Sequence, residues 1–240
     1  MRVEFLGAYI DVLTMEETVE RITGFVNSGY LHRVVTLNPE YLYRAQKQRE
    51  LLDIVNTSDL VTPDGIGIVW GCRIAGYPVV ERVTGIDLML NLCKRAASLG
   101  FRVFLLGAAP KVAEEAAQKL RERYPGIEIA GTHHGYFEEH ESTRIAKEIS
   151  KTNAQILFVA LGAPKQEMWI SKYQPQANVP VAIGVGGSFD VISGRVKRAP
   201  LWIQRIRVEW LYRLMQDPSR IKRQLVLPKF AWLVFKKYII

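Results

Sequence analysis

The chain has 240 residues, 48% of them hydrophobic, which suffices for one large domain or for a domain with an appendage. Its net charge of +8 is unevenly spread: residues 195–240 carry twelve Lys or Arg and two acids, whereas residues 1–194 carry twenty bases and twenty-two acids. No window reaches the roughly 18 apolar residues that a spanning helix needs, and acids interrupt the short apolar N-terminus. We therefore expect neither a membrane span nor a signal peptide, and a cytoplasmic location.

Helix and strand signals alternate along the first 194 residues. Thr14 and Glu17 form a capping box, which predicts a helix to about Asn27. The strands expected after it are 33–37, 59–62, 102–106, 127–131, 155–161 and 179–185, and the helices are 40–56, one after Asp64, 86–99, 110–124, 139–152 and one from about Pro164. Nearly continuous apolar strands separated by helices predict a parallel sheet covered on both faces. The expected fold class is α/β, a Rossmann-like, doubly wound and mostly parallel sheet.

A basic helical appendage, 195–240, is predicted to follow a globular domain, 1–194. Apolar residues recur mostly at helical spacing over 200–215, and an apolar run over 230–235 is flanked by lysines. Three of the five tryptophans also lie in this tail. Short amphipathic, basic and aromatic segments are typical of helices that lie in a bilayer interface. The alternative is that the apolar face packs on the domain or on a second subunit, so a homo-oligomer stays open.

Polar residues and glycines follow the predicted strands at their carboxyl ends, where an open parallel sheet binds ligands. Asp64 stands on a constrained turn between Pro63 and Gly65, which makes it a candidate general base or, alternatively, a helix N-cap. The glycine loop over 184–190 can approach a phosphate closely, or it is only a tight turn. The other polar or glycine positions at this edge are Thr36, Asn38, Glu40, Thr62, Gly107, Thr132–Tyr136, Gly162, Lys165, Gln166 and Glu167.

Metal chemistry is not expected from the sequence. No Asp-x-Asp occurs, and the cluster of three histidines and two glutamates over 133–140 does not have the spacing of a zinc site. The two cysteines, Cys72 and Cys93, fit neither a metal nor a disulfide pattern and are expected to be buried thiols in a reducing compartment.

Several motifs in chain order resemble the WecG/TagA/CpsF glycosyltransferases, above all the wall teichoic acid branch. The matching segments are Asn38-Pro39-Glu40, Thr62-Pro63-Asp64-Gly65, Glu81-Arg82-Val83-Thr84-Gly85, Leu161-Gly162-Ala163-Pro164-Lys165-Gln166-Glu167, Gly184-Val185-Gly186-Gly187-Ser188-Phe189-Asp190, Gly194, Arg198-Ala199-Pro200 and Trp202. The resemblance implies an inverting, metal-independent and cofactor-free transfer. It moves N-acetylmannosamine (ManNAc) from UDP-ManNAc to GlcNAc-pyrophosphoryl-undecaprenol, with a β-1,4 linkage, as an early step of wall teichoic acid synthesis.

The resemblance also implies roles for particular residues. Asp64 would take the proton from the acceptor 4-hydroxyl. Residues that match substrate-binding positions, or that lie near the nucleotide by the loop argument, are Thr36, Asn38, Arg82, Gln166, Gly187 and Asp190. The tail arginines Arg213, Arg220 and Arg223 would stabilise the leaving UDP, from the same or another protomer. The lipid acceptor implies peripheral docking of the tail at the anionic inner face of the plasma membrane, with Trp232 and Phe235 as candidate anchors.

Three alternatives stay open at this point. A related family member could use another UDP-sugar, such as UDP-glucose or UDP-N-acetylmannosaminuronic acid, for which Arg82 or Lys165 could supply the additional cation. A nucleic-acid-binding protein would explain basic residues among aromatics, but the helical periodicity of the tail is not what stacking platforms require, so no nucleic acid is expected. A non-catalytic binding subunit would tolerate the loss of the Asp64 carboxylate.

Overall fold

The core of the protein is a six-stranded parallel sheet. The computed structural model describes residues 1–200, 202–203, 209–216 and 225–240. The strands are β3 (His32–Leu37), β4 (Leu60–Pro63), β5 (Arg102–Gly107), β6 (Glu128–His133), β7 (Ile156–Ala160) and β8 (Val181–Gly184), in the spatial order β4-β3-β8-β7-β5-β6. Each neighbouring pair in this sheet is parallel. The predicted fold class is confirmed.

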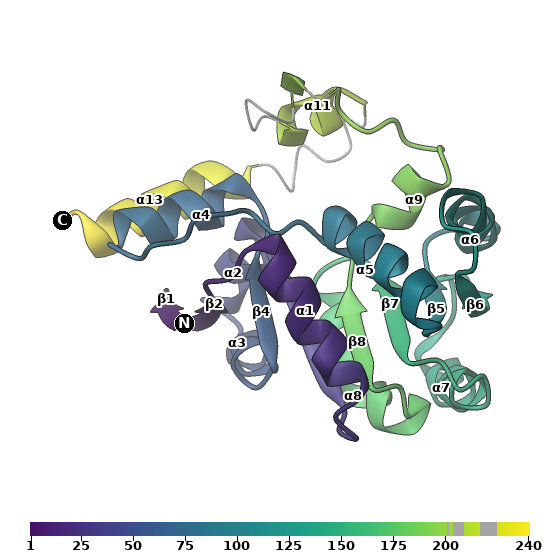
Figure 1. The fold of residues 1–240 in the computed structure, drawn as a ribbon. Helices are drawn as coiled ribbons and strands as arrows, with labels where there is room; N and C mark the ends of the chain where they lie inside the picture. Colours follow the sequence, from purple (N-terminus) through teal and green to yellow (C-terminus); the bar gives the residue numbers. More distant parts are fainter. Residues whose placement is uncertain (201, 204–208, 217–224) are drawn as a thin grey trace.

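Helices cover both faces of the sheet (Figure 1). One apolar cluster contains residues of helices α1 (Met15–Val26), α5 (Gly85–Leu99) and α6 (Val112–Arg123), and another contains residues of helices α7 (Ser142–Ser150) and α8 (Lys165–Ala177). Strand β5 divides its side chains between them: Val103 and Leu105 join the first cluster, and Phe104 joins the second. Because both faces are covered and every residue after the exposed Arg102 is buried, the strand is apolar without a period-two pattern.

Several local predictions hold and others need adjustment. The Thr14 capping box is present, because the Thr14 hydroxyl accepts from the Glu17 amide and the Glu17 carboxylate accepts from the Thr14 amide. The single helix expected over 40–56 is two helices, α2 (Pro39–Ala45) and α3 (Arg49–Asn56). The helix expected over 139–152 begins as a short 3₁₀ turn, η1 (Glu139–Glu141), before α7.

An N-terminal hairpin was not predicted from the sequence. Its strands, β1 (Arg2–Phe5) and β2 (Ala8–Asp11), pair antiparallel through a two-residue turn in which Gly7 has φ +80°. The buried Asp11 carboxylate accepts from the Val61 amide at 2.9 Å, which ties the hairpin to the edge strand β4. Four-residue strands are too short for a clear periodic signal, and this explains the omission.

The last two helices of the described chain are α11 (Glu209–Gln216) and α13 (Val226–Tyr238), which follow the short α9 (Ser188–Ile192). Helix α13 packs against α2 and α4 (Ile66–Ile74), and Figure 1 shows α13 and α4 side by side. Phe230 and Val234 are buried in this contact. The apolar face of α13 therefore packs on the body of the protein. The sequence had left open whether this face meets a bilayer or packs on protein. The domain boundary at residue 194 stays a prediction.

None of the helices in the described parts of the chain is long and apolar enough to cross a bilayer. Cys72 and Cys93 are free and fully buried, as expected, and burial raises the pKa of both thiols.

Candidate active site

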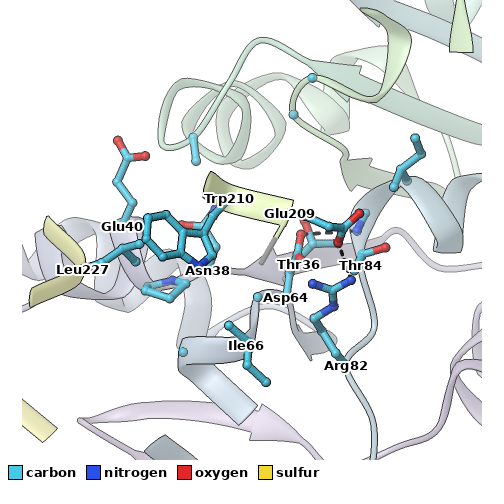
Figure 2. Close-up of a pocket in the computed structure, with 18 of the residues that line it drawn as sticks. Thr36, Asn38, Glu40, Asp64, Ile66, Arg82, Thr84, Glu209, Trp210 and Leu227 are labelled. Atoms are coloured by element: carbon cyan, nitrogen blue, oxygen red, sulfur yellow. Dashed lines mark hydrogen bonds and ion pairs between the residues drawn. The ribbon is translucent and has the colours of Figure 1, made fainter. Parts of the chain in front are cut away.

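A cavity of about 480 Å³ opens at the carboxyl ends of β3, β4 and β8. Its polar lining consists of Thr36, Asn38, Glu40, Asp64, Arg82, Thr84, Gln166, Ser188 and Glu209 together with Gly186 and Gly187. An apolar lining comes from α4, α11 and α13 and consists of Ile66, Trp70, Trp210, Leu227, Phe230 and Ala231. In Figure 2, Trp210 and Leu227 lie on one side of the cavity together with Asn38 and Glu40, and Arg82, Thr84 and Glu209 lie on the other. Six of the predicted site residues thus meet in one cavity: Thr36, Asn38, Asp64, Gln166 and Gly187, which follow strand ends, and Arg82, which the resemblance supplied.

Asp64 lies on the turn between β4 and α4. Its backbone amide donates to the Leu37 carbonyl at 2.8 Å, and the next residue, Gly65, has φ +89°. A Cβ on Gly65 would lie 3.2 Å from the Pro39 ring, so the turn requires glycine twice over. Gly65 is itself the N-cap of α4, without a side-chain cap, so the N-cap interpretation of Asp64 is wrong.

The Asp64 carboxylate is instead directed to another helix. The amide of Gly85, the first residue of α5, donates to Asp64 Oδ2 at 3.3 Å. Amides and the dipole at a helix N-terminus favour a negative charge. Asp64 is half-buried and lines the cavity, a setting that suits a carboxylate held ready to accept a proton.

Side-chain contacts at Gly184 join the carboxyl ends of β3 and β8. The Thr36 hydroxyl donates to the Gly184 carbonyl at 2.9 Å. On the opposite side, a Cβ on Gly184 would lie only 2.4 Å from Gln166 Nε2. Gln166 Oε1 in turn accepts from the Gly186 amide at 2.9 Å. Thr36 and Gln166 therefore shape the glycine loop from within the protein as well as lining the cavity.

Glu167 holds the Gln166 amide in this orientation. Gln166 Nε2 donates to Glu167 Oε1 at 2.7 Å, and this bond fixes which end of the Gln166 amide faces Gly186. Glu167 Oε2 is buried without a hydrogen-bond partner among the described residues. Burial raises the pKa of Glu167 to about 7, against the lowering effect of the Gln166 hydrogen bond.

The remaining predicted residues divide into three groups. Asn38 lines the cavity, but its Oδ1 caps α2 by accepting from the Tyr41 amide at 2.9 Å, so its amide nitrogen is the group that a ligand could use. Asp190 lies in α9 and is not among the cavity-lining residues, whereas Gly187 is. Of the tail arginines, Arg220 and Arg223 lie outside the described residues, and Arg213 is described only as a backbone position of α11.

An acid from the appendage enters the cavity. Glu209, the first residue of α11, is 8% exposed, and its Oε2 accepts from Arg82 Nη2 at 2.5 Å. Arg198 approaches Glu209 Oε1 to 3.8 Å and pairs with Asp87 at 2.7 Å. The Thr84 hydroxyl donates to the same Asp87 carboxylate at 2.7 Å, so Thr84 belongs to this network. This network joins the appendage to the loop that carries Arg82.

Glu209, Trp210 and Thr84 were not predicted as site residues. Glu209 did carry a signal, since it is one of only two acids among residues 195–240. Its partner Arg82 is 127 positions away, so no local pattern could have paired them. Thr84 is the N-cap of α5, which is the ordinary reason for a threonine at that position.

Two other expectations concern residues outside the cavity. Lys165 does not line it: this side chain faces a separate depression, with Nζ 5.7 Å from the centre of the Phe137 ring. Across the described ranges, no three His, Cys, Asp or Glu side chains lie close enough together to hold a metal ion.

Within the described parts of the chain, the cavity thus offers the Asp64 carboxylate beside the N-terminus of α5, two further carboxylates in Glu40 and Glu209, Arg82 paired with Glu209, the Asn38 amide and a glycine loop, beside an apolar wall. These groups can deprotonate a hydroxyl, bind an anionic group and hold a ligand that is polar at one end and apolar at the other.

Comparison with known proteins gives a consistent result. The model of the Glycosyl transferase WecG/TagA/CpsF family matches residues 3–240. A Bacillus subtilis (strain 168) protein is 38% identical over 232 residues, which cover 97% of this chain and 87% of that protein. A Staphylococcus aureus (strain MW2) protein is 37% identical over 237 residues, which cover 98% and 92%. Both relatives are named N-acetylglucosaminyldiphosphoundecaprenol N-acetyl-beta-D-mannosaminyltransferase.

Proposed function

The chain belongs to the WecG/TagA/CpsF family of glycosyltransferases, and from this premise we propose that it transfers ManNAc from UDP-ManNAc to GlcNAc-pyrophosphoryl-undecaprenol. The names of the relatives support the choice of sugar and acceptor. The observation that carries the proposal is the cavity at the strand ends, where Asp64 lies between an anion-binding side and an apolar wall.

In the proposed reaction Asp64 is the general base. The acceptor 4-hydroxyl oxygen attacks C1 of the ManNAc from the face opposite to the UDP, while Asp64 accepts its proton. The new C1–O bond forms as the bond from C1 to the UDP oxygen breaks, and the electron pair leaves with UDP. A single displacement inverts the anomeric centre, so one carboxylate base suffices. The position of Asp64 beside the Gly85 amide supports this role.

Cations would stabilise the charge that develops on the leaving UDP. Arg82 is the arginine that lines the cavity within the described residues, and Gly186 and Gly187 allow a phosphate to approach the backbone. Arg213, Arg220 and Arg223 complete the proposal as phosphate ligands from the tail, and we propose that they take the place of a metal ion. Asn38 and Gln166 orient the donor, the acceptor or both.

The membrane location is also part of the proposal. Helix α13 exposes Trp232, 62% accessible, and Phe235, 39% accessible, on the side away from Phe230. Three lysines flank these rings, and no acid occurs over 225–240. Aromatic side chains beside lysines suit the interface of an anionic leaflet, where the lipid-linked acceptor resides.

Competition among donors tests the proposal. Purified enzyme is incubated with detergent-dispersed GlcNAc-pyrophosphoryl-undecaprenol and equal amounts of UDP-ManNAc, UDP-N-acetylmannosaminuronic acid and UDP-glucose, and the lipid product is identified by mass spectrometry. The proposal predicts that the product gains the mass of ManNAc. A product that gains another sugar would reassign the donor, and no product with any of the three would overturn the reaction.

A further inference from the structure

The apolar wall of the cavity has no role in the proton transfer or in phosphate binding. It comes from three helices that lie beyond the strand ends: Ile66 and Trp70 from α4, Trp210 from α11, and Leu227, Phe230 and Ala231 from α13. Apolar and aromatic side chains commonly line ligand sites, where they bind the apolar parts of the ligand. This wall therefore indicates an apolar part of a ligand.

Helix α4 packs closely on α2 and on the N-terminal hairpin, and α13 lies against it. A Cβ on Gly67 would lie 2.8 Å from the Pro39 ring of α2 and 3.7 Å, an ordinary contact distance, from the Phe230 ring of α13. One turn later, a Cβ on Gly71 would lie 2.5 Å from the Phe5 ring of β1. Phe5 and Phe230 make an edge contact, with their centroids 6.3 Å apart. The glycines therefore place α4 against the body, and Phe230 reaches the same contact from α13.

The outward side of α4 carries a large aromatic residue at the cavity. Trp70 is 51% exposed although it lines the cavity, while its neighbours Ile68, Val69 and Cys72 are buried in the body. Leu227, near the start of α13, also lines the cavity, and Figure 2 shows it on the side of the cavity away from Arg82. An exposed tryptophan at the mouth of a polar cavity offers apolar surface to a ligand that extends outward.

Helix α13 carries further apolar side chains near the wall. Leu227, Phe230 and Ala231 line the cavity, and Trp232 and Phe235 follow Ala231 within about one turn, are exposed and have ring centroids 5.8 Å apart. A chain leaving the cavity along α13 would thus pass from one apolar surface to another. The polar groups around Asp64 and Arg82 lie on the opposite side.

We propose that the first isoprene units of the acceptor bind along this wall, between Trp70 of α4 and Leu227 of α13, so that the polyprenyl chain leaves the cavity over α13 toward the bilayer. This inference rests on the proposed function, because it assigns the apolar end of the same acceptor. It orients the acceptor: its GlcNAc lies at Asp64, and the diphosphate and lipid extend from there toward α4 and α13.

The test compares two water-soluble acceptors that differ only in their apolar end, GlcNAc-pyrophosphoryl-geraniol and GlcNAc-pyrophosphoryl-methanol, without detergent or membrane. We expect the native enzyme to use the geranyl acceptor with a kcat/KM at least about tenfold higher, because two isoprene units are removed from water. Trp70→Ala should reduce this preference, a ratio measured within the one variant, to less than about threefold.

The matched control is Trp232→Ala, which removes a tryptophan of similar exposure that does not line the cavity. Trp232→Ala should keep the native preference. Equal use of both acceptors by the native enzyme would overturn the inference and leave the proposed function intact, and so would an equal loss of preference in both variants.

A second measurement does not depend on transfer. Geranyl diphosphate that carries a photoreactive diazirine on its terminal isoprene is irradiated with the native enzyme, and the labelled peptides are mapped. Labels on 66–74 and 225–235 are expected. Labels confined to other segments would overturn the inference even if the enzyme transferred no sugar.

Discussion

At the scale of single residues, the site depends on positions where no side chain fits. Gly184 leaves room for Gln166, and Gly65 allows the turn that directs Asp64 toward α5. An added Cβ on Gly184 would displace the Gln166 amide group, and the positive φ of Gly65 disfavours any side chain there. The Thr36 hydroxyl and the Gln166 amide then hold the strand end and the glycine loop in register.

The buried carboxyl of Glu167 makes stability depend on pH. Its pKa is about 7 in the folded protein, whereas the ordinary pKa of a glutamate side chain is 4.5. Between these values the native state keeps a proton that the unfolded state releases, so this group lowers the free energy of unfolding as the pH rises from about 4.5 to 7. Above pH 7 this group has lowered the free energy of unfolding by its full amount, about 3 kcal/mol relative to pH values below 4.5. Denaturant unfolding of native protein and Glu167→Gln across pH 4.5–8 measures it.

Glu167→Gln retains an oxygen that can accept from Gln166, and it removes the titration. We therefore expect the difference in stability between the variant and the native protein to change across this pH range. A constant difference would show that Glu167 does not keep its proton near neutrality.

At the scale of elements, α11 is joined to the body by charge and α13 by apolar packing. The start of α11 is anchored by the Glu209–Arg82 ion pair, with Arg198 close by. Helix α13 instead inserts Phe230 and Val234 among residues of α2, α4 and the N-terminal hairpin. The Tyr238 hydroxyl also accepts from the Leu6 amide at 3.0 Å. These two kinds of contact predict different responses to substitution.

Removing the Glu209 charge should weaken donor binding. Glu209→Gln leaves Arg82 and Arg198 without their shared carboxylate and loosens α11, so we expect the KM for UDP-ManNAc to rise about tenfold. Steady-state kinetics measures this. The control is Glu115→Gln, which breaks an exposed ion pair with Arg195 at 2.7 Å far from the cavity and should leave both kinetic parameters unchanged. An unchanged KM in Glu209→Gln would contradict the role of the network.

Two phenylalanines of α13 provide a matched pair for the packing of this helix. Phe230 is 2% exposed and Phe235 is 39% exposed. Phe230→Ala should lower the free energy of unfolding by about 3 kcal/mol, because it leaves a cavity beside Gly67 and Phe5. Phe235→Ala should lower it by less than about 1 kcal/mol. Equal losses in chemical denaturation would mean that α13 is not docked through Phe230.

At the scale of the whole molecule, charge and hydrophobicity are segregated. Residues 1–194 are close to neutral, and the excess of positive charge lies in residues 195–240. Within the described part of this tail, α13 turns its lysines and two aromatic rings outward while its other face is buried. The segregation suits a body that faces the aqueous phase and a tail that faces an anionic surface.

Vesicle binding should depend on the lysines of α13. Replacing Lys229, Lys236 and Lys237 by Gln should lower the partition coefficient onto phosphatidylglycerol vesicles by roughly 100-fold, at about 1 kcal/mol per charge. The control replaces Lys94, Lys147 and Lys151, which are exposed on α5 and at the end of α7. Cosedimentation in low salt distinguishes the two. Equal losses would mean that only the net charge matters.

The sequence predicted the sheet and much of the site because both follow local rules. Asp64, Asn38 and Gln166 directly follow strands or begin helices, and the carboxyl ends of parallel strands meet at one edge. The Arg82–Glu209 pair could not be predicted, since it joins segments with no common local signal. The packing of α13 was undecided for another reason: an apolar helix face looks the same whether protein or lipid covers it.

The most direct test of the account is radiolabelled transfer from UDP-ManNAc to GlcNAc-pyrophosphoryl-undecaprenol in the presence of EDTA, with native enzyme, Asp64→Asn and the exposed control Asp53→Asn. We predict that the native enzyme and Asp53→Asn are active, and that Asp64→Asn loses at least about 100-fold in kcat, because it cannot accept the proton. Undiminished transfer by Asp64→Asn would contradict the assignment of the base, and loss of native activity in EDTA would contradict transfer without a metal.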